Sequence, residues 1–250
     1  MNKLIVVGKK FTVFAEKNEN VLTVNEFERF VWTGKINKVG KIILGQGVQL
    51  DDISRTIDII RQNYPNKIRE IINLNDIYYQ NNRDHQKQVH KCRKENILIT
   101  SPQKKGNDNY HARLILQDSS ELLCDHQTGQ HIQGMILIEA ARQAIIATTE
   151  KYFFREVGIN IAEKYFTLTS LNVIFLSFVF PLPVAVSLRV LSLEITKYGK
   201  LTCECYITFK QNKTKAAEIC FIFSVYDFNY ITEVENKLAS LYHHCYLNSM

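Results

Sequence analysis

The sequence predicts an α+β fold preceded by a small α/β unit, and three observations support this prediction. Roughly the first 80 residues alternate strand and helix signals, which is typical of parallel β-α-β units. One stretch near residue 140 would be apolar on almost every side of a helix, so we expect it inside a core. Four strand-like segments then follow one another with turn residues between them.

Composition excludes some classes of function. The 250 residues allow one or two domains with a substantial core, and the formal net charge of +6 would suit an acidic partner. The basic residues are scattered and form no Lys/Arg run, so we expect no nucleic-acid binding. The six cysteines form no CxxC pair, so we expect reduced thiols in a cytoplasmic protein.

No segment is expected to span a membrane. Residues 1–7 contain only a very short apolar run, which does not fit a signal peptide. The longest apolar stretch, residues 173–186, is interrupted by Ser177, Pro181 and Pro183, and it is too short to cross a bilayer.

The N-terminal α/β unit is predicted to cover residues 1–79. Its second helix would be capped by Asp51 or Asp52 and would end before Pro65. In chain order, the expected elements are a strand at residues 4–7, a helix at 24–32, a strand at 41–44, a helix with Ile53, Ile57 and Ile60 on one face, and a strand at 68–74. A scaffold or partner-docking role is the default expectation for this unit.

Gly45-Gln46-Gly47 follows a predicted strand and therefore allows two interpretations. A dinucleotide-binding turn would need a third glycine where Leu50 stands, so we favour a tight strand-to-helix turn and expect no cofactor.

A polar segment at residues 80–88 is predicted to be a linker, because it lacks periodicity. The elements expected after it are strands at 96–101 and 110–117, a helix from residue 135 to 147, strands at 166–179, 184–195, 201–210 and 216–228, and a C-terminal helix at 231–250 with a capping box of Thr232 and Glu235. In the strand at 201–210, apolar residues alternate with polar ones, as they do when one face is buried.

The central helix carries charge that a buried helix should not carry without a reason. Glu139 and Arg142 stand three residues apart, and Gln143 stands four after Glu139, so all three share one helical face. This pattern indicates either a satisfied buried ion pair or an active site.

The same region resembles the A-factor biosynthesis hotdog family. The matching motif residues are Asp125, His126, Gly129, His131, Gly134, Met135, Glu139, Ala140, Arg142 and Gln143. An upstream block, Val89-His90-Lys91 followed by residues 96–100, looks like the opening strand of that family. The resemblance covers roughly residues 88 to 230.

This resemblance implies a hotdog fold, in which an antiparallel sheet wraps around a central helix, at residues 89–230. It also implies sites between paired hotdog units. Better-known members carry two units in one chain, so this single copy is expected to form a homodimer.

The resemblance implies an acyltransferase that moves a 3-oxoacyl group from acyl carrier protein, or acyl-CoA, to dihydroxyacetone phosphate or a similar hydroxyl acceptor. Such an enzyme would serve signal or secondary-metabolite biosynthesis of the γ-butyrolactone or butenolide type. A thioesterase or dehydratase-like lyase is one alternative. A non-catalytic acyl or signal binder is another.

Glu139 is the first candidate for a catalytic base, because burial among apolar neighbours would raise its pKa, although Arg142 would oppose that rise. Arg142 would hold a phosphate or an enolate-like oxygen, or else merely pair with Glu139. His126 would orient a carbonyl or act as an acid near the helix N-terminus, or brace the loop. The expected substrate-binding residues are Asp125, His131, Gly134, Met135 and Gln143, of which Gln143 is favoured as a structural hydrogen-bonding residue.

Two further comparisons limit the chemistry. Asp125, His126 and His131 have the right ligand types for a metal, but no further ligands with zinc spacing accompany them, so we expect no metal site. Hotdog hydroxyacyl dehydratases resemble this chain at Gly134 and Glu139, yet they carry a histidine where Asp125 stands. This departure speaks against dehydration.

Overall fold

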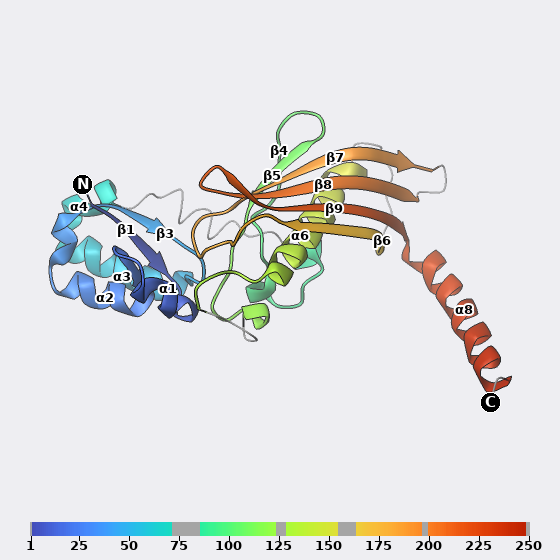
Figure 1. Cartoon of the computed structure of the whole chain (residues 1–250), viewed down its shortest axis with the longest axis horizontal. Coiled ribbons are helices and arrows are strands. Elements are labelled where there is room, and N and C mark those ends of the chain that lie inside the picture. Colours follow the sequence, from blue (N-terminus) through green and yellow to red (C-terminus); the bar gives the residue numbers. More distant parts are fainter. Residues whose placement is uncertain (1, 72–85, 124–128, 155–163, 197–199, 249–250) are drawn as a thin grey trace.

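The computed structural model contains a three-stranded parallel sheet, a six-stranded antiparallel sheet around one central helix, and a projecting C-terminal helix (Figure 1). The structure describes residues 2–71, 86–123, 129–154, 164–196 and 200–248. The predicted fold class is therefore confirmed.

The N-terminal unit has the strand order β2-β1-β3, with all strand pairs parallel. Its strands are β1 (Asn2–Val7), β2 (Val21–Thr23) and β3 (Val39–Leu44), and its helices are α1 (Thr12–Glu16), α2 (Val24–Trp32), α3 (Leu50–Asn63) and α4 (Pro65–Ile71). Thr23 and Glu26 form a capping box at the start of α2. Buried side chains such as Val6, Phe27 and Ile42 form a separate core for this unit.

Two predictions in this unit are wrong. Neither aspartate caps α3, because the helix begins at Leu50 after Gln49, and Asp51 and Asp52 lie within its first turn. The described part of the strand predicted at residues 68–74 belongs to helix α4. Proline at the first position favours a helix start, and Ile68 and Ile71, three residues apart, pack on the core of this unit.

The second sheet is antiparallel throughout and has the order β4-β5-β7-β8-β9-β6. Its strands are β4 (Gln103–Lys104), β5 (Asn109–Arg113), β6 (Lys164–Phe175), β7 (Ala185–Ile195), β8 (Leu201–Gln211) and β9 (Thr214–Asp227). The long strand β6 lies at one edge and pairs with β9 alone. Its other side is therefore open for pairing.

Helix α6 (Gly134–Thr148) continues into a π-helical turn (Thr149–Phe153) and packs against the sheet. Most of its residues are buried, as the sequence predicts. The alternation predicted for β8 is also confirmed, because Cys203, Cys205 and Ile207 are at most 1% exposed. The two cysteines are therefore core residues.

The strand predicted at residues 96–101 is not regular. The segment pairs with the chain after β5 through a bridge between Ile99 and Leu114 and through two backbone hydrogen bonds near it. A 3₁₀ turn at Lys94–Asn96 occupies its start, and the Gln143 side chain binds the Asn96 carbonyl and the Leu98 N–H group, which a strand ladder would otherwise use. Another 3₁₀ turn covers Gln86–Val89, at the end of the predicted linker, whose residues 80–85 lie outside the described parts of the chain.

Helix α8 (Phe228–Asn248) starts earlier than expected, and its predicted capping box is wrong. The Asp227 carboxylate accepts hydrogen bonds from the backbone N–H groups of Asn229 and Tyr230. The Thr232 hydroxyl instead donates to a carbonyl inside the helix. The helix begins directly after Asp227 because this side chain satisfies free N–H groups of the first turn.

The N-terminal unit is fixed to the larger sheet. The Gln46 side chain donates to the Leu114 carbonyl and accepts from the Leu116 N–H group, so Gly45-Gln46-Gly47 forms a turn that docks on the other unit. Asp118 accepts from the backbone N–H groups of Lys9 and Lys10. Burial raises the pKa of Asp118 despite these hydrogen bonds.

No helix in the described residues is long and apolar enough to cross a membrane.

Candidate active site

Helix α6 presents a carboxylate that is held by an arginine one turn away. The Arg142 Nε donates to Glu139 Oε2 at 2.8 Å and its Nη2 donates to Oε1 at 2.9 Å. This two-pronged contact is the strong form of an Arg–carboxylate pair. The Glu139 side chain is 18% exposed and that of Arg142 is 40% exposed, so the arginine reaches solvent while the carboxylate lies beneath it.

Two further groups bind the same carboxylate. The Lys91 Nζ lies 2.8 Å from Glu139 Oε1, and the Gln143 Nε2 donates to this oxygen at 3.0 Å. Sequence reasoning gave Lys91 no role, although it lies in the upstream block that resembles the family. Two cations therefore face one carboxylate, and this cluster carries one excess positive charge.

The pKa expected for Glu139 is wrong in direction. Burial alone would raise the pKa, but hydrogen bonds from Arg142, Lys91 and Gln143 outweigh it and lower the pKa to about 2. Two cations were needed for this reversal, and the sequence indicated only Arg142. At neutral pH the group is a carboxylate.

Gln143 connects this cluster to the segment before β4. Its side chain is fully buried, its Oε1 accepts from the Leu98 N–H group at 2.8 Å, and its Nε2 also donates to the Asn96 carbonyl at 2.9 Å. Each hydrogen bond stays within the chain, so Gln143 holds Glu139 and the 96–98 segment in a fixed relation.

A second ion pair lies near the start of β6. The Lys164 Nζ binds Glu150 at 2.9 Å, His90 lies 3.7 Å from the same carboxylate, and the His90 ring meets the edge of Phe166. Burial would raise the pKa of Glu150, but hydrogen bonds from His90 and Lys164 lower it overall.

A cavity of about 160 Å³ lies between α6 and the inner face of β6 and β9, with the Glu139 cluster in its wall. Apart from Thr167, the rest of its lining is apolar and includes Ile138, Phe166 and Phe223. An ionised cluster beside an apolar cavity suits a ligand with a charged or polar head and an acyl chain.

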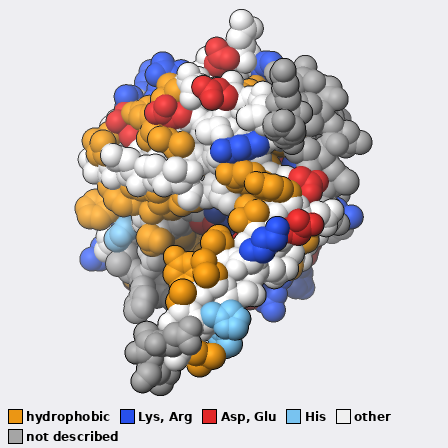
Figure 2. Space-filling model, turned by 90° about the vertical axis from the view of Figure 1, so that its right-hand side faces the viewer, with side chains coloured by type: hydrophobic (Ala, Val, Ile, Leu, Met, Phe, Trp, Pro, Cys, Tyr) orange, Lys and Arg blue, Asp and Glu red, His pale blue; other side chains and the backbone are white. Residues whose placement is uncertain are grey.

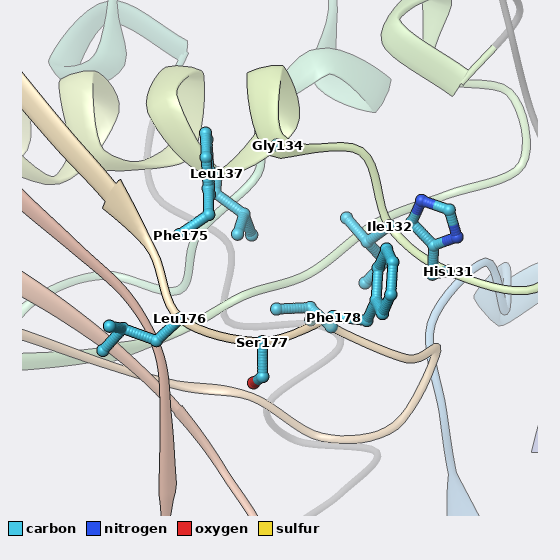
Figure 3. Close-up of a pocket in the computed structure, with 9 residues that line it drawn as sticks. His131, Ile132, Gly134, Leu137, Phe175, Leu176, Ser177 and Phe178 are labelled. Carbon is cyan, nitrogen blue, oxygen red and sulfur yellow. The ribbon is translucent and has the colours of Figure 1, made fainter.

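A larger cavity of about 570 Å³ lies at the start of α6 and next to the end of β6 (Figure 3). His131, Gly134, Phe175 and Phe178 are among its lining residues, and the rings of His131 and Phe178 are 4.8 Å apart. A Cβ on Gly134 would lie 2.6 Å from the Phe175 ring, so a larger residue at this position would have to displace that ring. The two cavities follow one another along the groove between α6 and β6.

The predicted site residues therefore divide into four groups. Glu139, Arg142 and Gln143 lie together, whereas His131 and Gly134 line the larger cavity about one to two helical turns away. Met135 is 68% exposed and lines neither cavity. Asp125 and His126 lie outside the described residues. Among the described side chains, no cluster of His, Cys, Asp and Glu has the arrangement of a metal site.

Comparisons with known proteins identify a family domain in this chain. The model of the A-factor biosynthesis hotdog domain matches residues 83–227. No curated protein is significantly similar to the chain.

Similar solved structures include a conserved protein from Pseudomonas aeruginosa with 14% identity and a TM-score of 0.40, which covers 57% of this chain and 100% of its own. A mutant thioesterase from the same organism has 11% identity and a TM-score of 0.39, covering 63% and 96%. A thioesterase from Haemophilus influenzae has 11% identity and a TM-score of 0.37, covering 62% and 92%.

Proposed function

The chain belongs to the A-factor biosynthesis hotdog family, and from this membership we propose that it acts on acyl thioesters. Its proposed reaction transfers a 3-oxoacyl group from acyl carrier protein to a hydroxyl of dihydroxyacetone phosphate or a similar phosphorylated three-carbon acceptor. The resemblance to that family suggests these substrates, and the residues around Glu139 support them.

The observation that carries this proposal is the charge of the Glu139 cluster at the wall of an apolar cavity. Lys91 and Arg142 exceed Glu139 by one positive charge, and a phosphorylated acceptor would balance it. Arg142 uses its Nε and Nη2 on Glu139, and its Nη1 makes no hydrogen bond within the described residues. That nitrogen is the proposed first contact for the phosphate.

Glu139 is proposed to receive the proton of the attacking hydroxyl. In the free protein its low pKa makes it a weak base. When a phosphate draws Lys91 and Arg142 toward itself, their hydrogen bonds to Glu139 weaken and its pKa rises. Acceptor binding would thereby make Glu139 a stronger base than it is in its ion pair.

The proposed reaction then proceeds in two steps. The acceptor hydroxyl forms a C–O bond with the thioester carbonyl as Glu139 takes its proton, and N–H groups at the start of α6 near Gly134 stabilise the oxyanion. The C–S bond breaks next, and the proton passes from Glu139 to the departing thiolate. Gly134 and Glu139 stand about 7.5 Å apart along the helix, so the reacting carbonyl would lie between the proton acceptor and the N–H groups that stabilise the oxyanion.

We also propose a homodimer through the open edge of β6. Leu168 and Leu171, which face the same side as Phe223 and Phe221 of β9, are 57% and 39% exposed, and Ile174 on the other face of the strand is 50% exposed. Large apolar side chains exposed on both faces of an edge strand are typical of an interaction site. The groove between α6 and β6 opens toward this edge. A second chain would therefore cover the side of the site that one chain leaves open.

The test is mass spectrometry of purified protein incubated with a 3-oxoacyl carrier protein, with and without dihydroxyacetone phosphate. An acyl ester of the acceptor, formed only when the acceptor is present, is the expected product. Free acid in both reactions would indicate a thioesterase instead of a transferase. Loss of water from a 3-hydroxyacyl thioester would indicate a lyase. An unchanged thioester that stays bound would indicate a binding protein.

Arg142→Lys is the informative variant, because it keeps the positive charge but replaces the several N–H donors of the guanidinium with one terminal nitrogen. We expect the KM for the acceptor to rise roughly tenfold, with a smaller effect on the KM for the acyl carrier protein. If the KM values for both substrates rise equally, Arg142 does not bind the acceptor specifically.

A further inference from the structure

The contacts between helix α8 and the sheet that involve described residues lie at the base of the helix. The Tyr165 hydroxyl on β6 donates to Glu235 at 2.8 Å, and the rings of Tyr165 and Phe228 are 6.2 Å apart. From Glu235 to Leu247, every residue of the helix is exposed, and Figure 1 shows it projecting from the sheet. The base fixes the direction of the helix, while its outer half lies in solvent.

The outer half nevertheless has the pattern of a helix that packs on another surface. Ile231, Val234, Leu238, Leu241 and Cys245 follow the 3-4-3-4 spacing of an apolar seam. Leu238 and Leu241 are 49% and 57% exposed. Most of the stability of a helix in a protein comes from tertiary packing of its apolar face, so this exposed seam indicates a partner surface.

A matching patch lies at the opposite end of β6. Phe175, Leu176 and Phe178 are 53%, 51% and 68% exposed and border the larger cavity. They are far from α8 in the same chain, because Lys164, at the other end of β6, pairs with Asp227, which immediately precedes α8.

The symmetry of an edge-to-edge dimer brings these two surfaces together. Two copies of an edge strand related by a two-fold axis pair antiparallel, so the start of β6 in one chain lies beside the end of β6 in the other. Helix α8, which leaves from the start of β6, then lies next to the Phe175–Phe178 patch of the second copy. The two α8 helices lie at opposite ends of the shared sheet and do not meet.

The direction and length of α8 are sufficient for this contact. In Figure 1 the helix runs toward the side on which β6 has no neighbouring strand. Its 21 residues extend about 30 Å, the width of roughly six strands. The view onto this end of the molecule shows hydrophobic side chains along the projecting helix and at the sheet edge (Figure 2).

We propose that α8 is an exchanged arm: its apolar seam packs on residues 175–178 of a second copy of this chain and closes the larger cavity there. This inference rests on the homodimer proposed above. The two helices and two receiving patches together offer on the order of 1,500 Å² of exposed surface, comparable to a standard stable interface. The partner's α8 would thus supply one wall of the cavity at the start of α6.

A photo-crosslinking experiment tests the arm directly. p-Benzoylphenylalanine replaces Leu241, or Ser240 as the control on the other face, in mixed ¹⁴N- and ¹⁵N-labelled protein. Mass spectrometry should find crosslinks from position 241 to a peptide containing residues 175–178 of the differently labelled chain, and fewer from position 240. Crosslinks within one chain, between two α8 helices, or none at all in a dimeric protein would overturn the arm exchange.

Light scattering on the same samples separates the two proposals. A dimer with crosslinks elsewhere refutes the arm and leaves the homodimer intact, whereas a monomer refutes both.

A matched pair of double variants gives a second test. Leu238→Ser with Leu241→Ser should weaken dimerisation roughly tenfold or more in sedimentation equilibrium. Asn236→Ser with His243→Ser introduces the same residue on the opposite face and should change it by less than about twofold. Equal effects would mean that the seam makes no contact.

Discussion

Helices α6 and α8 both carry many apolar residues, but α6 is mostly buried and the outer half of α8 is exposed. Ten of the 15 residues of α6 are buried, and its two charged residues, Glu139 and Arg142, bind each other and Lys91. In α8, the leucines at 238, 241 and 247 are about half exposed. Burial therefore forces the charges of α6 to be paired, whereas the leucines of the α8 seam stay exposed to solvent among the described residues.

The largest expected difference between the two helices is the cost in stability of replacing a leucine with alanine. Leu137→Ala on α6 should lower the free energy of unfolding by about 3 kcal/mol, because it empties space next to a packed core. Leu241→Ala on α8 should cost less than about 0.5 kcal/mol in dilute protein that is mostly monomeric. Urea unfolding measures both, and equal losses would show that α8 is packed within its own chain.

Removal of a carboxylate should show the same contrast between α6 and α8, with a smaller change in the free energy of unfolding. Glu139→Gln leaves Lys91 and Arg142 facing each other without a carboxylate, and we expect a loss of about 2 kcal/mol. Glu233→Gln on the exposed side of α8 should change stability by less than about 0.5 kcal/mol. If both variants unfold alike, the Glu139 cluster does not stabilise the fold.

The low pKa of Glu139 predicts a pH dependence with a definite sign. Because folding lowers its pKa from 4.5 to about 2, its contribution is fully present above pH 4.5 and is lost as the pH falls toward 2. Glu150 also loses stabilisation on acidification, so the informative quantity is the difference from Glu139→Gln. The stability advantage of the wild type should shrink by about 1–2 kcal/mol across that window, as measured by urea unfolding at several pH values. A constant difference would contradict the lowered pKa.

The smallest expected effect concerns the base of α8. Tyr165→Phe removes the hydrogen bond to Glu235, and amide hydrogen exchange in α8 should become roughly threefold faster. Tyr242→Phe is the matched control, because Tyr242 is 74% exposed and its hydroxyl has no hydrogen bond within the described residues. Unchanged exchange in Tyr165→Phe would show that other contacts orient the helix.

The way the two sheets are joined was not predictable. Gln46 and Asp118 bond to groups in the other unit, and Phe14 stacks on Phe180 at 5.8 Å. In the sequence, each reads as an ordinary turn or core residue, because nothing near it in the chain indicates the other unit. The N-terminal unit is therefore a fixed part of the molecule in this structure.

Local periodicity by itself determined the central helix, the alternation in β8 and the strand-like segments around them, whereas the family followed from the resemblance of the motif between Asp125 and Gln143. These features depend on residues within about two turns or one strand, which propensity and burial patterns report directly. The same reasoning failed at residues 68–71, where Pro65 starts a helix, and at residues 96–101, where the Gln143 side chain binds the backbone of Asn96 and Leu98. Only the tertiary structure decided that Lys91 joins Arg142 on Glu139, because a pKa depends on every charge brought near the group. It also decided that α8 extends into solvent, because an apolar seam specifies that a helix packs but not against which surface.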